Sequence, residues 1–232
     1  MSEPSIVAID ELELSFAPQA WSFADQRRME IDAYFEARQR NTPELWNGRV
    51  LLLSRWVLGE RRLSGRFFET DFASFLAWRD WGFPDRAVVN CFAMGALRTA
   101  DGAFLVGVMA AHTANAGRIY FPAGTPDPDD VRGSIVDLEQ SVVREVAEET
   151  GLTPRDFTPR SGWEAVVEGP RIALFKVLDV DTAAVNLRAR ILDHLARETA
   201  PEFSDIRILR SRTDLDPRMP VFVRTFLDRA WS

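Results

Sequence analysis

The most regular pattern of hydrophobic positions lies between residues 135 and 152. Apolar side chains recur there at the three- and four-residue spacing of a helix with one buried face, at Ile135, Leu138, Val142 and Val146. Gly151 follows the last of them and predicts the end of that helix. The sequence therefore predicts an amphipathic helix here, packed against a core by its apolar stripe.

The rest of the chain alternates between strand-like and helix-like patterns. In its first third, the sequence predicts one or two strands within 5–16, a helix over 25–40, strands at 49–58 and 61–70, and a helix over 72–82 with Asp71 as its N-cap. Later segments predict a hairpin of 87–98 and 103–111, strands at 118–121, 163–169 and 171–180, a helix over 183–198, a strand within 201–211 and a closing helix over 220–231. This order predicts an α+β fold, with helices on both faces of a mixed sheet.

No linker rich in glycine, serine or proline interrupts the chain near residue 85. We therefore expect residues 1–85 to form an N-terminal α+β extension packed on a core domain of residues 86–232. Five of the seven tryptophans fall in this extension. We interpret at least three of them as core residues, and a surface for base stacking or dimer formation is the alternative.

Composition narrows the classes of function. With a formal net charge of −7 and a pI near 5.0, the chain offers no basic field to a nucleic-acid backbone, so we expect no nucleic-acid partner. The N-terminal stretch lacks the pattern of a signal peptide, and no apolar run reaches membrane-spanning length. The single cysteine, Cys91, lies in an apolar run and is expected to fill the core of a cytoplasmic protein with no membrane partner.

Three glutamates share one side of the predicted helix. Glu145, Glu148 and Glu149 are spaced i, i+3 and i+4, and two of them follow the buried stripe by seven residues. Carboxylates placed so close together repel one another, and they are costly to bury unless they are paired or bind a metal. Mg²⁺ or Mn²⁺ fits this set because hard cations prefer carboxylate oxygens. An acidic helix face exposed to solvent is the alternative interpretation.

Residues 144–152, REVAEETGL, resemble the second half of the Nudix box, G-x5-E-x7-R-E-U-x-E-E-x-G-U, and meet each of its fixed positions. Residues 121–124, FPAG, resemble the loop that opens the box. The first half departs from the pattern: nineteen residues rather than thirteen separate Gly124 from Arg144, and Val136 replaces the expected glutamate. The neighbouring Asp137 is a candidate replacement, and the alternative is that it starts the helix, where its charge favours the helix dipole.

The extra length comes from residues 125–130, TPDPDD. Their aspartates lack the glycine and the distal glutamate of a calcium-binding EF-hand loop. We therefore expect a solvated acidic loop.

Resemblance to the Nudix family implies an α/β/α sandwich that hydrolyses a nucleoside diphosphate linked to another moiety. It implies that Glu145, Glu148 and Glu149 bind Mg²⁺ or Mn²⁺ as the cofactor, and that Arg144 orients a glutamate by a charge-assisted hydrogen bond. The implied partner is therefore a small-molecule nucleoside diphosphate derivative. A homodimer stays an open alternative.

The resemblance also implies a general base, which in this family lies on the box helix or on a later loop. Glu202 is our candidate on a later loop and Glu168 is the second. His112, in a loop before the box, is expected at the surface, and contact with substrate is the alternative. His194 is expected on the surface of its helix.

The box does not specify the moiety attached to the diphosphate. Residues 47–59 and 67–78 look weakly like the N-terminal region of Nudix proteins that cleave nucleotide sugars, so a nucleotide sugar is our first hypothesis. Coenzyme A, ADP-ribose and dinucleotides are alternative substrates, and a Nudix-fold nucleotide sensor without activity is an alternative function. The intact R-E-x-x-E-E sequence favours an enzyme, whereas Val136 favours a sensor.

Overall fold

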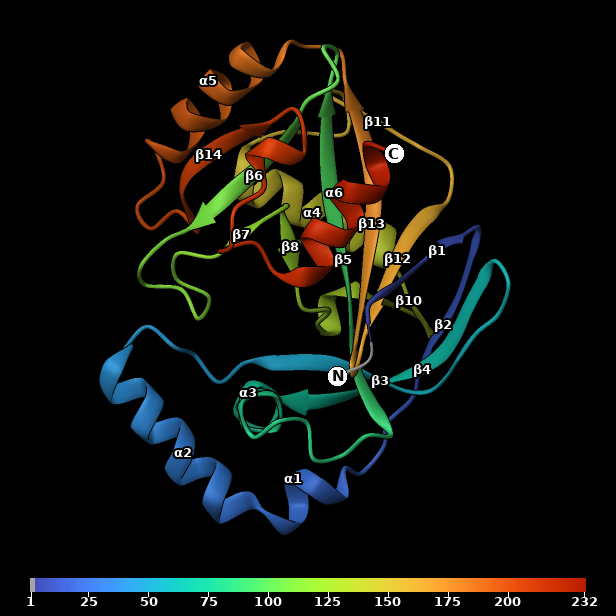
Figure 1. The fold of residues 1–232 in the computed structure, drawn as a ribbon. Coiled ribbons are helices and arrows are strands. Elements are labelled where there is room, and N and C mark those ends of the chain that lie inside the picture. Colours follow the sequence, from blue (N-terminus) through green and yellow to red (C-terminus); the bar gives the residue numbers. More distant parts are fainter. Residues whose placement is uncertain (1–2) are drawn as a thin grey trace.

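The structure, a computed structural model, describes residues 3–232 and is built on one large mixed β-sheet (Figure 1). Its strands are β1 (Ser5–Ile9), β2 (Glu11–Phe16), β3 (Arg49–Leu58), β4 (Arg62–Asp71), β5 (Val88–Thr99), β6 (Phe104–Met109), β7 (Ile119–Tyr120), β8 (Ala123–Gly124), β9 (Val131–Arg132), β10 (Ile135–Val136), β11 (Thr158–Pro159), β12 (Trp163–Glu168), β13 (Arg171–Val180) and β14 (Phe203–Leu209). The α-helices are α1 (Ser22–Gln26), α2 (Arg28–Asn41), α3 (Phe72–Asp80), α4 (Leu138–Thr150), α5 (Ala184–Leu195) and α6 (Val221–Ala230). The predicted α+β class is confirmed.

The sheet follows the order β1-β12-β13-β5-β3-β4-β2-β10-β9, with β6, β7, β8, β11 and β14 attached beside this path. Two pairs are parallel, β13 with β5 and β2 with β4, and the other pairs are antiparallel. The prediction of a mixed sheet is therefore correct.

The long strand β5 separates two helical layers (Figure 1). Gly95 faces α4 so closely that a Cβ atom built on it would lie 2.4 Å from Cγ2 of Val146. Met94, the residue before Gly95 in β5, faces the other side of the sheet and belongs to the core beneath α6. On that side Phe175 of β13 stacks on Phe226 of α6, with ring centroids 4.2 Å apart. Helices therefore cover both faces of the sheet, as the predicted α/β/α arrangement requires.

The extension adds a third helical layer. Helices α1–α3 pack with Leu52 and Phe68 on one face of β3 and β4, whereas Leu51 and Phe67 on the opposite face join the core beneath α4. Backbone pairing also connects the two regions, since β1 pairs with β12 and β3 pairs with β5. The sheet is continuous across residue 85, and the division into two domains there stays a proposal.

The tryptophans of the extension are divided between core and surface. Trp21 and Trp78 are buried, and Trp56 and Trp81 are partly buried against the hydrophobic cores. Trp46 is 81% exposed. Core packing thus accounts for most of this group.

Two predicted helices begin or continue differently in the structure. Ile135 is not part of the buried stripe: it lies in β10 and is 59% exposed. The reason is that Asp137 is the N-cap, accepting a hydrogen bond from the backbone N–H of Gln140 at 3.0 Å, so α4 starts only at Leu138. The helix predicted over 25–40 is interrupted at Arg27, which separates α1 from α2.

Within residues 3–232, no helix has the length and apolar character needed to cross a membrane. Cys91 is fully buried, as predicted. Burial raises the pKa of its thiol, which excludes it as a thiolate nucleophile at neutral pH.

The close approach of α4 to β5 generates the first testable prediction. Gly95→Ala should destabilise the fold by about 1–3 kcal/mol, because Val146 lacks the freedom to move away from an added methyl group. Urea unfolding of both proteins measures this difference. Gly59→Ala is the matched control, since its added Cβ meets only a carbonyl oxygen at 3.7 Å. Equal midpoints for Gly95→Ala and the wild type would contradict the packing argument.

Candidate active site

The two glycines of the box, Gly124 and Gly151, are needed for different structural reasons. A Cβ atom on Gly124 would lie 2.2 Å from Oε1 of Glu145, so this position has no room for a side chain. Gly151 ends α4 with a φ of 70°, in the left-handed region that favours glycine. The first glycine lets the loop before α4 lie directly on the Glu145 carboxylate, which is 12% exposed.

Glu149 lies one turn further along α4 and is 5% exposed. Its carboxylate accepts a hydrogen bond from the backbone N–H of Ala123 at 3.1 Å. The carboxyl group of Glu202 lies within hydrogen-bonding reach of Glu149 and in the field of Glu145. Glu202 is positioned by the start of β14, where its carbonyl accepts the N–H of Ala110 at 2.8 Å. The fold thus brings this candidate base to the box helix.

Arg144 connects the glutamates of α4 to the acidic loop before it. One guanidinium nitrogen lies 2.8 Å from Glu145, and another lies 3.1 Å from Asp130 and 3.4 Å from Asp127. Asp130 is 1% exposed and also accepts the backbone N–H of Asp127. The buried Asp130 carboxylate therefore positions the Arg144 guanidinium, which in turn holds the Glu145 carboxylate.

The prediction of a solvated acidic loop is therefore wrong for Asp130. Residues Pro128–Asp130 form a short 3₁₀ helix that is capped by Asp127 and turns the last aspartate inward. A signal for this was present in the sequence. Residues 125–130 carry aspartates between the two halves of the box, in which Val136 replaces the glutamate expected in the first half.

Val136 stands where the box glutamate is expected and Asp137 follows it, but neither side chain contacts Arg144. Val136 is 3% exposed and belongs to the core. Asp137 caps α4, which is the alternative weighed for it from the sequence. The acid that pairs with Arg144 is Asp130.

Burial and mutual repulsion dominate the electrostatics of this cluster. Burial raises the pKa of Glu145 to about 7, with Glu148 and Glu202 adding to the rise and Arg144 opposing it. The pKa of Glu149 is raised well above its usual value, first by burial and then by Glu145 and Glu202. Without a cation the cluster therefore favours protonated carboxyl groups.

The third box glutamate, Glu148, differs from the other two. Its side chain is 60% exposed and lies 3.6 Å from Arg144. His194, predicted at the surface, is instead half-buried: its Nε2 lies 3.2 Å from the Glu148 carbonyl oxygen, and its ring packs against Gly151. The second candidate base, Glu168, lies at the end of β12 in the field of Arg171 and is not part of this cluster.

The donor set fits a divalent cation by its chemistry. No three His, Cys, Asp or Glu side chains in the described range 3–232 surround a common point as a ready-made metal site. Glu145 and Glu149 are nevertheless buried carboxylates with raised pKa values, beside the exposed Glu148. A hard cation relieves such repulsion by binding the ionised oxygens. These three glutamates remain the proposed ligands.

Comparison with known proteins gives matches only among solved structures. No family model and no curated protein matches the chain. A MutT protein from Methanosarcina mazei Go1 is 21% identical over 61% of this chain and 92% of its own, with a TM-score of 0.43. The Nudix hydrolase RenU from M. smegmatis is 17% identical over 60% of this chain and 80% of its own, with a TM-score of 0.39. An Ap4A hydrolase from C. elegans is 16% identical over 51% of this chain and 79% of its own, with a TM-score of 0.36. Overlaps with TM-scores below 0.5 carry no conclusion on activity.

The different environments of two aspartates give the second prediction. Asp130→Asn should lower turnover about 10- to 100-fold, because Arg144 loses the charged partner that positions it. Asp137→Ala should instead cost ~0.5–2 kcal/mol of stability as a lost N-cap, with unchanged turnover per folded molecule. Thermal unfolding and steady-state kinetics of both variants separate the two roles. Reduced turnover of a fully folded Asp137→Ala variant would contradict this assignment.

The raised pKa of Glu145 gives the third prediction. Because its pKa is about 7 in the fold and 4.5 as an ordinary glutamate, its stabilising contribution is present below pH 4.5 and is lost as the pH rises to 7. The metal-free protein should lose about 3 kcal/mol across this window, and Glu149 acts in the same direction. Urea unfolding after chelation, at pH 5 and pH 8, measures the difference.

Saturating Mg²⁺ should remove this loss at pH 8, because the cation binds the ionised carboxylates. Glu145→Gln is the matched control and should reduce the pH dependence of the metal-free protein. Equal stability of metal-free wild type at both pH values would overturn the electrostatic account.

Proposed function

We propose that the protein is a metal-dependent hydrolase that cleaves the diphosphate of a nucleoside diphosphate linked to another moiety. The observation that carries this proposal is the placement of the buried Glu149 and the largely enclosed Glu145 on one side of α4, with Arg144 holding the Glu145 carboxylate and the exposed Glu202 beside them. The resemblance of residues 144–152 to the Nudix box supports the same reaction.

Each residue has a distinct role in this proposal. Glu145, Glu148 and Glu149 hold Mg²⁺ or Mn²⁺, which when bound neutralises the diphosphate and lowers the pKa of a bound water. Arg144 keeps the Glu145 carboxylate in its orientation through the 2.8 Å contact. Glu202 is the proposed general base, because it reaches the cluster from a separate loop and accepts a proton from the attacking water.

A nucleotide sugar is the first candidate substrate, with coenzyme A, ADP-ribose and dinucleotides as alternatives. A screen of these compounds and of nucleoside triphosphates, with Mg²⁺ or Mn²⁺, tests the reaction class directly. Release of two phosphate-bearing products from a diphosphate substrate supports the proposal. The second function, a nucleotide sensor, is favoured by tight nucleotide binding without turnover of any compound in the screen.

The proposed ligands give the fourth prediction. Glu148→Gln and Glu149→Gln should each reduce turnover by orders of magnitude while the fold is retained, since the amide keeps the shape of the side chain but loses the charge that binds the metal. Steady-state kinetics at saturating Mg²⁺, with circular dichroism of each variant, measures both effects. The exposed Glu36→Gln on α2 is the control and should leave turnover unchanged. A ligand role is abandoned for either residue whose variant keeps normal turnover.

A further inference from the structure

A histidine of α5 contacts the last turn of α4 from a distant part of the chain. Nε2 of His194 lies 3.2 Å from the carbonyl oxygen of Glu148, which is 46 residues earlier in the sequence. Because a carbonyl oxygen only accepts hydrogen bonds, this ring nitrogen carries a proton and donates. The histidine side chain is 26% exposed, so water has limited access to compete for the carbonyl.

The Glu148 carbonyl needs this donor because α4 ends two residues later. In a longer helix it would accept the N–H of Leu152, four residues further on. The helix ends at Thr150, and the Leu152 N–H donates to Oγ1 of Thr150 at 3.3 Å instead. Among the described residues, the ring of His194 is therefore the donor that satisfies this carbonyl.

The ring has room beside the end of the helix because residue 151 is a glycine. A Cβ atom on Gly151 would lie 2.6 Å from both Cγ and Nδ1 of His194. A side chain at this position would therefore push the imidazole away from α4. The last glycine of the box allows the left-handed turn and the approach of the histidine at the same time.

Core packing of α5 holds the ring at this place. The face of α5 that lies in the core comprises Leu187, Ile191 and Leu195. These side chains share one hydrophobic core with the apolar stripe of α4. Close-packed side chains leave little freedom for one helix to slide past the other, so the imidazole has a defined position relative to the end of α4.

The same histidine stands where α5 passes into the segment that carries Glu202. Its carbonyl accepts the N–H of Arg197 at 2.9 Å, and Oε1 of Glu198 lies 3.9 Å from its Nε2. The chain then leads to the start of β14, where the Glu202 carbonyl accepts the N–H of Ala110. The histidine therefore connects two segments that supply the acidic cluster.

The last turn of α4 carries Glu148 and Glu149, two of the three proposed metal ligands. Helix ends fray because their last carbonyls lack partners within the helix. A donor at the Glu148 carbonyl limits this fraying. It thereby keeps both carboxylates at a constant position relative to the rest of the helix.

We propose that His194 is a positioning residue, which holds the last turn of α4 at a fixed place relative to the segment that carries Glu202. It acts through the backbone of Glu148 and makes no contact with the metal or the substrate. The roles of Glu148, Glu149 and Glu202 in this inference rest on the proposed function. Loss of the support behind a metal ligand lowers the affinity for the metal.

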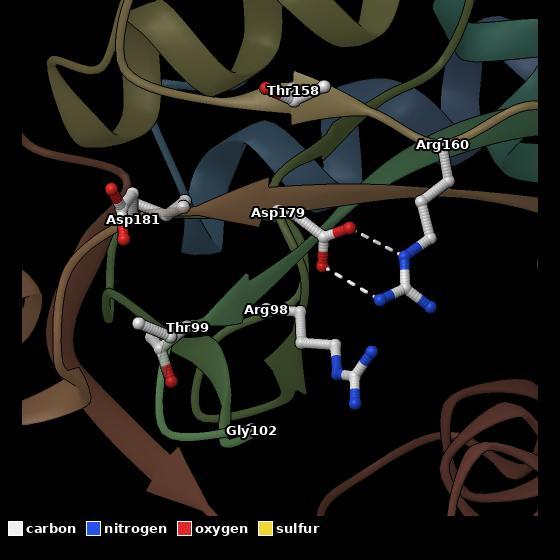
Figure 2. A pocket seen from close by; sticks show the side chains of 9 residues that line it. Arg98, Thr99, Gly102, Thr158, Arg160, Asp179 and Asp181 are labelled. Atoms are coloured by element: carbon white, nitrogen blue, oxygen red, sulfur yellow. Dashed lines mark hydrogen bonds and ion pairs between the residues drawn. The ribbon is translucent and has the colours of Figure 1, made fainter.

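Two substitutions separate the hydrogen bond from the bulk of the side chain. His194→Gln keeps a donor, because its amide nitrogen is as many bonds from Cα as Nε2 of the imidazole. His194→Met has a similar length and no donor. Arg160→Gln is the control: it removes an ion pair with Asp179, with N–O distances of 2.6 and 3.0 Å, from the chain after α4 and leaves the Glu148 carbonyl untouched (Figure 2).

Hydrogen exchange of the metal-free full chain tests the inference without metal or substrate. His194→Met should speed exchange at the last turn of α4 about 5- to 10-fold, because that turn loses one hydrogen bond, and should leave the first turn unchanged. His194→Gln should recover most of the protection, and Arg160→Gln should exchange as the wild type does. Equal exchange of wild type and His194→Met overturns the proposal. An equal rise at both ends of α4 shows a general loss of stability and overturns it too.

The second test measures Mn²⁺ binding by calorimetry in the absence of substrate. His194→Met should weaken binding about 10-fold, whereas His194→Gln and Arg160→Gln should bind Mn²⁺ as the wild type does. Unchanged affinity of His194→Met overturns the positioning of the metal ligands. If the wild type binds no Mn²⁺, the proposed function fails, and the exchange measurement still decides whether His194 holds the end of the helix.

Discussion

Burial of neighbouring carboxylates on α4 is the constraint on which the rest of the site depends. The apolar stripe of α4 packs against β5, so that helix has little freedom to turn its glutamates toward solvent. Glu145 and Glu149 are consequently enclosed, and the fold adds Glu202 beside them. Such a cluster is stable only if protons, an arginine or a metal cation balance its charge, and each of these has a place in the proposed chemistry.

Arg144 provides a permanent positive charge beside these carboxylates, and the loop before α4 holds its guanidinium in position. Asp130 is buried and contacts the guanidinium, whereas the position of the missing box glutamate holds Val136 in the core. The replacement of the expected glutamate by Val136 is thus accompanied by a carboxylate contact to Arg144 from Asp130 in the preceding loop. The extra residues of the loop allow its backbone to turn inward, and the 3₁₀ turn directs the carboxylate toward Arg144.

The extension is joined to the core by backbone pairing and by side-chain contact. It shares the sheet through β1 and β3, so its helices have fixed positions relative to the core. The turn after α3 places the Phe83 ring 4.7 Å from the Arg171 guanidinium of β13.

The sequence alone determined the features that depend on local spacing. Apolar periodicity predicted α4 and most strands, and the R-E-x-x-E-E spacing predicted that Glu145 and Glu149 share one side of that helix, because helical geometry depends on neighbouring residues. The burial of Asp130 against Arg144 and the packing of Arg171 on the Phe83 ring were decided by the tertiary structure. These contacts join residues separated in the chain, whose burial and charge environment exist only after the sheet has assembled.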